Sequence, residues 1–151
     1  MAIPSYRVFF DTSVFIAALL SPKGAAGELL RLAEAGVIRM VVCEKVITEA
    51  DEVLVKKFPD LIHESRKLWK HLAPEIASTP ISGQIKPFSQ KLPESDALIL
   101  CIAHLAKVKV FVTWNTRDFM LPGVASLVDC PIVVPSDCLK LFRKWVEDFM
   151  D

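Results

Sequence analysis

The sequence lacks an excess of charge of either sign. Its 151 residues include 18 Lys and Arg and 18 Asp and Glu, so the formal net charge is zero. Such a chain has no overall basic field with which to attract nucleic acid, and any such binding has to come from a local basic patch. The charge balance therefore excludes nucleic-acid binding by the surface as a whole.

Long hydrophobic runs are also missing. Stretches such as Val14–Leu20 and Ala97–Ala103 are the longest, and they are far shorter than the ~20 apolar residues of a membrane-spanning helix. The N-terminus shows no signal-peptide pattern, because the short apolar run after Arg7 ends at once in Asp11. We therefore expect a cytoplasmic protein that does not associate with a membrane.

Cysteines with metal-binding or disulfide-like spacing are absent as well. The four cysteines, Cys43, Cys101, Cys130 and Cys138, contain no CxxC pair, and the three histidines do not complete a zinc site. We expect reduced thiols, as is usual in the cytosol.

The sequence is rich in apolar residues, which make up 52% of the chain at a mean hydropathy of +0.39. This content argues against disorder and favours a sheet covered on both faces or a surface for self-association. The length fits one domain, spanning residues 1–151. Together with the hydrophobic segment Val14–Leu20, the composition leads us to expect a homodimer.

Short β-favouring runs alternate with segments of helical periodicity, which predicts a three-layer αβα sandwich around a parallel sheet of four or five strands. The segment 77–93 contains several prolines and is expected to be mostly loop. Ser95 and Ser136 are expected to cap the two helices that follow them. The strands are predicted at 7–10, 39–43, 76–78, 109–113 and 131–134.

Four acidic residues lie near the predicted ends of strands or at the start of the helices beside them. Asp11 follows the first strand, Glu49 lies in the helix after the second, Asp96 begins the helix before the fourth, and Asp118 follows that strand. Because ligands of open parallel sheets bind beyond the carboxyl ends of the strands, we expect these acids to converge.

Clustered carboxylates suit Mg²⁺ or Mn²⁺, which prefer oxygen ligands and can promote in-line displacement at a phosphate. Thr12, Ser13, Thr113 and Asn115 could orient the carboxylates by hydrogen bonding. Each acid also has a simpler interpretation. Asp11 could cap a helix, and Asp96 could interact favourably with the positive end of a helix dipole. Glu49 could be a solvated surface residue, and Asp118 a turn residue.

Four sequence blocks resemble the PIN-domain family, and in particular the bacterial and archaeal PIN proteins grouped with VapC-type toxins. In the resemblance, Asp11, Glu49 and Asp96 match the first three family acids, while Asn115 stands where a fourth acid is frequent and Asp118 lies three residues on. The resemblance implies a magnesium- or manganese-dependent ribonuclease, often dimeric, with an antitoxin as partner. The blocks are Val8–Phe15, Val41–Glu49, Glu94–Ala97 and Val112–Phe119.

The prediction is therefore a metal-dependent ribonuclease that acts on single-stranded or structured RNA as the toxin of a toxin–antitoxin pair. Arg117, inside the fourth block, is the expected RNA contact, and Trp114 could stack on a base or pack at the rim. The open alternative is a catalytically weak PIN-like module that binds RNA or a partner protein, with Asn115 as its mark. A haloacid-dehalogenase-like phosphatase is disfavoured, because its second Asp would occupy the position of Ser13.

Overall fold

A five-stranded sheet lies at the centre of the computed structural model, which describes residues 5–150. The strand order is β3-β2-β1-β4-β5, and every neighbouring pair is parallel. The expected parallel α/β architecture is thereby confirmed, with five strands. The strands are β1 (Arg7–Phe10), β2 (Arg39–Val42), β3 (Glu75–Ile76), β4 (Val110–Val112) and β5 (Ile132–Val133).

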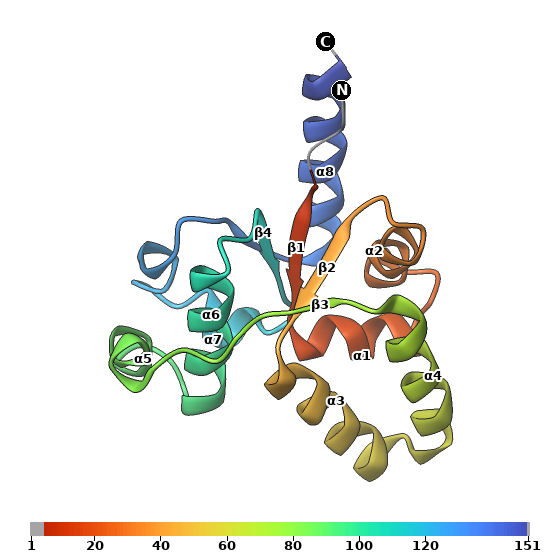
Figure 1. Cartoon of the computed structure of the whole chain (residues 1–151), viewed down its shortest axis with the longest axis horizontal. Helices are drawn as coiled ribbons and strands as arrows, with labels where there is room; N and C mark the ends of the chain where they lie inside the picture. Colours follow the sequence, from red (N-terminus) through yellow and green to blue (C-terminus); the bar gives the residue numbers. More distant parts are fainter. Residues whose placement is uncertain (1–4, 151) are drawn as a thin grey trace.

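Helices cover both faces of this sheet (Figure 1). The chain moves outward from β1 to β3 and then returns to the other side of β1 to form β4, so right-handed crossovers place the earlier and later helices on opposite faces. One layer holds α1 (Thr12–Leu20), α2 (Ala25–Glu34), α3 (Glu44–Lys57), the turn η1 (Pro59–Leu61) and α4 (Ile62–Leu72); the other holds α5 (Ser82–Ser89), α6 (Glu94–Leu105) and α7 (Thr116–Phe119).

The final helix, α8 (Pro135–Met150), follows the turn η2 (Ala125–Leu127) and β5, packs against α2 and β4, and extends past the sheet. Its inner residue Phe142 packs against Tyr6, with ring centroids 5.1 Å apart. No single helix within residues 5–150 is long and apolar enough to cross a membrane. The α1–α2 pair reaches the necessary length and composition only together, across a 99° bend.

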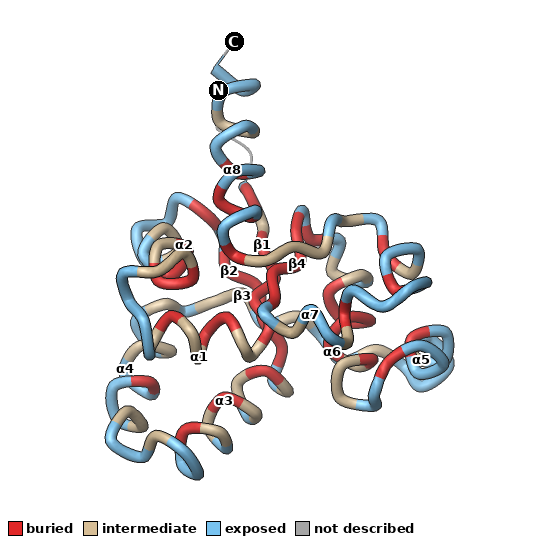
Figure 2. The backbone as a smooth tube through the Cα atoms, turned by 180° about the vertical axis from the view of Figure 1, so that it is seen from behind, coloured by how far each residue is buried: buried red, intermediate tan, exposed pale blue. Residues whose placement is uncertain are grey.

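The core lies where the central strands meet the helices on both faces (Figure 2). Val8, Phe9 and Phe10 of β1 are all fully buried, as expected for a strand whose two faces are both covered. Phe9 stacks on Phe111 of the adjacent β4, with ring centroids 5.5 Å apart. This packing fixes β1 and β4 side by side, and with them the residues that follow each strand.

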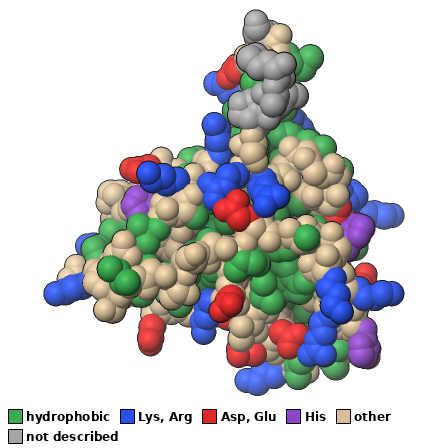
Figure 3. Space-filling view, in the orientation of Figure 1, with side chains coloured by type: hydrophobic (Ala, Val, Ile, Leu, Met, Phe, Trp, Pro, Cys, Tyr) green, Lys and Arg blue, Asp and Glu red, His purple; other side chains and the backbone are tan. Residues whose placement is uncertain are grey.

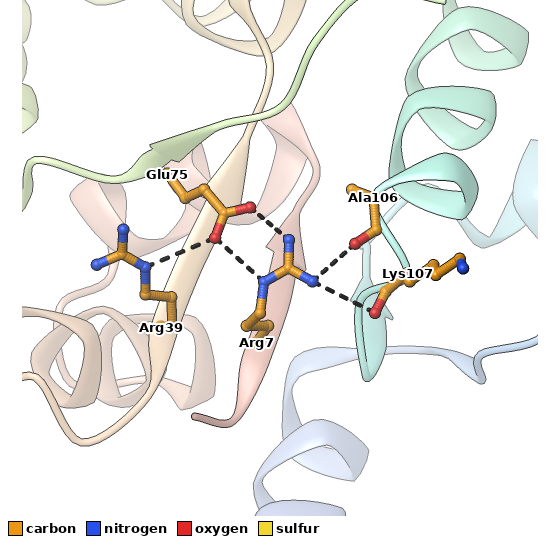
Figure 4. Close-up of polar contacts among 5 residues, drawn as sticks. All are labelled: Arg7, Arg39, Glu75, Ala106 and Lys107. Atoms are coloured by element: carbon orange, nitrogen blue, oxygen red, sulfur yellow. Dashed lines mark hydrogen bonds and ion pairs between the residues drawn. The ribbon is translucent and has the colours of Figure 1, made fainter. Parts of the chain in front are cut away.

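A charged cluster fastens the short edge strand β3 to the rest of the sheet (Figure 4). Arg7 of β1 donates hydrogen bonds from its guanidinium to the Glu75 carboxylate and, over 2.7 Å, to the carbonyl of Ala106 after α6. Arg39 lies 3.6 Å from the same carboxylate, and Arg7 is the main cause of a lowered Glu75 pKa. Three segments are therefore joined through one arginine.

Three details of the sequence prediction were wrong. Segment 77–93 contains a helix, α5, despite Pro87 in its interior, because the buried ring of Phe88 anchors the segment and the Gln84 side chain accepts a bond from the N–H of Ile81. Ser95 does not cap α6, which begins one residue earlier, after Pro93. Ser136 likewise lies inside α8, whose first residue is Pro135, a proline position favoured by its fixed φ.

Candidate active site

Asp11 follows β1 directly and is 4% exposed. It occupies the N-cap position of α1, but its side chain makes no capping bond. Its Oδ2 instead accepts hydrogen bonds from Ser13 Oγ at 2.9 Å and Thr113 Oγ1 at 2.7 Å. Burial raises the pKa of Asp11, the two hydroxyl bonds oppose that rise, and the nearby Glu49 adds to it. The carboxylate is thus oriented by β1, α1 and the end of β4, and the simple capping interpretation does not hold.

Glu49 reaches the same place from α3. Its Oε1 accepts a bond from Thr12 Oγ1 at 3.3 Å, and its Oε2 accepts one from Ser95 Oγ at 2.9 Å. Both oxygens are therefore held by hydroxyls of other helices, which a freely solvated surface glutamate would not be. Ser95 is the contributor that the sequence did not reveal, because a serine near a helix start favours the capping position.

Asp96 lies in the first turn of α6 and is half-buried. Its pKa is raised from 3.8 to about 7, first by burial, then by its hydrogen bond with Asp118, and then by the negative charges of Asp11, Asp118 and Glu49. Like charges at close range disfavour ionisation, and at Asp96 this repulsion adds to the effect of burial. The raised pKa of Asp96 therefore reflects the closeness of the other three acids.

Asn115 links Asp96 to Asp118. Its Nδ2 donates to Asp96 Oδ2 at 3.4 Å and to Asp118 Oδ2 at 3.2 Å, while its Oδ1 accepts from the backbone N–H of Asp118 and so caps α7. Thr113, fully buried below, accepts the N–H of Asn115 and donates to Asp11. The neutral amide of Asn115 therefore lines the cleft beside the three acids, at its fourth corner, whereas Asp118 does not line the cleft.

These groups surround an open cleft of about 610 Å³. Apolar residues of α1 and α3 form one wall, and Trp114, 47% exposed, lies at its rim. Asp118 does not line the cleft and contacts it through Asn115 and Asp96. The exposed Arg117 does not line it either, so an RNA contact by Arg117 stays a prediction. The lining residues are Asp11, Thr12, Ser13, Ile16, Ala17, Leu20, Glu49, Val53, Asp96, Trp114 and Asn115.

The donor set suits a hard divalent cation, although the side chains are not arranged as a finished metal cluster. No group of three His, Cys, Asp or Glu residues within 5–150 is close enough together to hold an ion as it stands. Over the same range, however, Asp11, Glu49, Asp96 and Asp118 have no Lys, Arg or His ion-pair partner. Converging carboxylates with oxygen-rich neighbours and no counter-charge are the surroundings that Mg²⁺ or Mn²⁺ prefers.

Comparison with known proteins is consistent with this site. A family model described as PIN domain matches residues 7–117, a range that begins at β1 and contains Asp11, Glu49, Asp96 and Asn115. The chain belongs to the PIN-domain family. PIN domains are generally nucleases and typically use divalent metal ions. The resemblance seen in the sequence blocks is therefore confirmed.

The fold of this PIN domain is similar to that of a chain in the crystal structure of VapBC2 from Rickettsia felis bound to a DNA fragment from their promoter. The TM-score is 0.64 at 13% sequence identity, over 85% of this chain and 98% of that one. At this identity the likeness concerns the fold. No curated protein matches the sequence.

Proposed function

We propose that this PIN domain is a magnesium- or manganese-dependent endoribonuclease that cleaves single-stranded or structured RNA. The observation that carries the proposal is the convergence of Asp11, Glu49 and Asp96, from three separate elements, on one open cleft without a basic partner among the described residues. Family membership supports a nuclease, and the donor chemistry supports a divalent cation.

In this proposal Asp11, Glu49 and Asp96 hold the metal, and Asp118 assists from behind Asn115. A bound cation supplies the positive charge that draws a phosphodiester towards the acids and favours in-line displacement. The chain's own contribution is orientation. Ser13 and Thr113 fix the Asp11 carboxylate, Thr12 and Ser95 fix that of Glu49, and Asn115 donates to Asp96.

The test is cleavage of a labelled single-stranded RNA by the purified protein with Mn²⁺ or Mg²⁺, with and without EDTA. We expect metal-dependent cleavage that falls at least a hundredfold in Asp11→Asn and in Asp96→Asn, because each removes a metal ligand. A matched control is Glu52→Gln, which removes an exposed acid of α3 three residues after Glu49. Equal cleavage by wild-type protein and Asp11→Asn would refute the assignment.

A second candidate rests on Asn115. Because this residue is neutral, the fourth corner of the cleft carries less charge than a carboxylate there would provide, which favours a catalytically weak PIN module that binds RNA or a protein. Asn115→Asp distinguishes the two. Cleavage that appears only in this variant supports the weak module, whereas cleavage by the wild-type chain supports the nuclease.

The proposed partners rest on the shared fold. This PIN domain shares its fold with a chain of a VapBC complex, which supports an antitoxin as its partner. We propose that it acts in the cytoplasm as the toxin of such a pair. We also propose a homodimer, which light scattering at micromolar concentration tests. Val14, Phe15 and Ala18 of α1 are buried within the single chain, so an interface would use other apolar residues.

A further inference from the structure

A second groove adjoins the acidic cleft where Ser95 contacts Glu49. It has a volume of about 700 Å³ and lies among α3, α5 and α6, against the helix that the sequence did not predict. In Figure 1, α3 and α6 both begin at the lower edge of the sheet, where the strands end. Its lining residues are Lys45, Ser82, Ile85, Lys86, Ser89, Glu94, Ser95 and Leu98.

The groove and the cleft share a wall. Ser95 lines the groove, Glu49 lines the cleft, and the Ser95 hydroxyl donates to the Glu49 carboxylate over 2.9 Å. The next residue, Asp96, already faces the cleft. A linear polymer bound at the acids can therefore extend into the groove, because only the Ser95–Glu49 contact separates the two.

The chemistry of the groove differs from that of the cleft. Lys45 of α3 and Lys86 of α5 form no ion pair in the described part of the chain, and Ser82 and Ser89 add two hydroxyls on the α5 side. One acid, Glu94, lines the α6 side, so the charged lining residues sum to one excess positive charge. The half-buried Ile85 and Leu98 provide apolar contact.

The α5 wall is held in place by packing on α6. Phe88 is 5% exposed, and its ring lies 5.9 Å from that of His104, measured between centroids. The Cys101 thiol of α6 donates to the carbonyl of Gln84 over 3.5 Å. Lys86 is therefore carried by a docked helix, and its position relative to α6 is fixed by the fold.

We propose that this groove binds the sugar-phosphate backbone of the single strand whose scissile phosphate lies at the acids, with Lys45 and Lys86 contacting flanking phosphates. The inference rests on the proposed nuclease function, which places the scissile phosphate at the acids. It deepens that function by assigning the basic contact to α3 and α5 and not to Arg117. Lysines and serine hydroxyls are common phosphate contacts.

Because the chain has no net charge, binding of nucleic acid requires a local basic patch, and this groove provides one. Basic and acidic side chains are interspersed over the face shown in Figure 3, as expected for a chain of zero net charge. A strand would then be held by few contacts beside the reacting phosphate. An acidic peptide would meet the same two lysines, but membership of a nuclease family favours a nucleic-acid strand, and competition by poly-glutamate separates the two occupants.

The experiment measures binding of a short fluorescein-labelled oligouridylate by anisotropy over a series of KCl concentrations. The Asp11→Asn background with Mg²⁺ keeps the strand intact, which a gel verifies. We compare Lys45→Ala/Lys86→Ala with Lys67→Ala/Lys70→Ala, which removes the same charge from exposed positions on α4. Lys45→Arg/Lys86→Arg retains the charge and checks that the groove variants fold.

Each phosphate contact on a single strand contributes about 0.7 to the slope of log affinity against log salt, so loss of two contacts makes the slope shallower by about 1.4. Because the electrostatic attraction is largely screened near 1 M salt, this corresponds to roughly a 25-fold weaker affinity near 0.1 M. We expect that loss in the groove variant alone, normal binding in the arginine variant, and tighter binding in Glu94→Gln.

Equal slopes in the two double-alanine variants would overturn the proposal, as would competition by poly-glutamate as effective as competition by unlabelled oligouridylate. Failure of the groove and failure of the nuclease are distinguishable. RNA cleavage by the wild type with unchanged slopes rejects only the groove, whereas the expected slope change without cleavage rejects only the nuclease.

Discussion

Asp96 provides the sharpest test of the acidic cleft, because its charge opposes folding when no cation is bound. The rise in its pKa from 3.8 to about 7 corresponds to about 4 kcal/mol at about 1.36 kcal/mol per pH unit. Since the side chain is only half-buried, solvent screening reduces this to about 1–2 kcal/mol. Asp96→Asn should therefore stabilise the metal-free protein at pH 8 by that amount.

The sign of the pH dependence follows from linkage. A carboxyl whose pKa is higher in the folded than in the unfolded chain contributes stability that is fully present below the unfolded pKa and is lost as pH rises through the folded pKa. For Asp96 that window runs from pH 3.8 to about 7. The advantage of Asp96→Asn over wild type should thus be small near pH 4 and largest above pH 7.

The assay is thermal unfolding in EDTA at a series of pH values. A difference of about 1–2 kcal/mol corresponds to a melting temperature higher by about 2–8 °C in a domain of this size. Glu94→Gln removes an exposed acid two residues away and controls for general charge effects. Adding Mn²⁺ should narrow the gap by stabilising wild type more than Asp96→Asn. A lower melting temperature for Asp96→Asn at pH 8, or an advantage that is the same at all pH values, would show that the charge of Asp96 does not oppose folding.

Three further predictions follow from other contacts. Ser95→Ala should weaken Mn²⁺ affinity about tenfold with little change in melting temperature, because it frees one oxygen of Glu49; isothermal calorimetry measures the affinity. Phe88→Ala should destabilise the packing of α5 by about 3–5 kcal/mol and remove hydrogen-exchange protection from residues 82–89 before the rest of the chain. Arg7→Gln should flatten the loss of stability below about pH 4.5, because Arg7 lowers the Glu75 pKa and that stabilisation disappears as Glu75 is protonated; acid titration followed by circular dichroism tests it.

Strand positions were predictable because the parallel sheet leaves a simple signature. A run such as Val8-Phe9-Phe10 ending in Asp11 identifies a fully buried strand and the residue that leaves it, and the alternation of such runs with helices implies the crossovers. The convergence of Asp11, Glu49 and Asp96 on one cleft agrees with that logic, because parallel strands end at one edge. Their role as metal ligands stays a prediction.

Tertiary contacts decided what the sequence could not show. Nothing local predicts that α5 forms around Pro87, since its stability comes from Phe88 packing on α6. The local sequence predicts that Ser95 caps a helix, because serine favours that position, whereas its hydroxyl donates to Glu49, 46 residues away in the chain. The groove beside the acids was missed for the same reason, since one of its walls is α5.

Asp11 stands where a helix cap belongs and caps nothing. A capping side chain at such a position typically contributes about 1 kcal/mol, so the chain forgoes that stability to hold a buried acid against Thr113 and Ser13. Replacing Asp11 with Ser or Thr, residues that cap well and carry no charge, should therefore yield a protein that tolerates more heat and has lost its acid. A screen for thermostable variants of this chain would then enrich inactive substitutions at position 11. At this position thermal stability and activity therefore oppose each other.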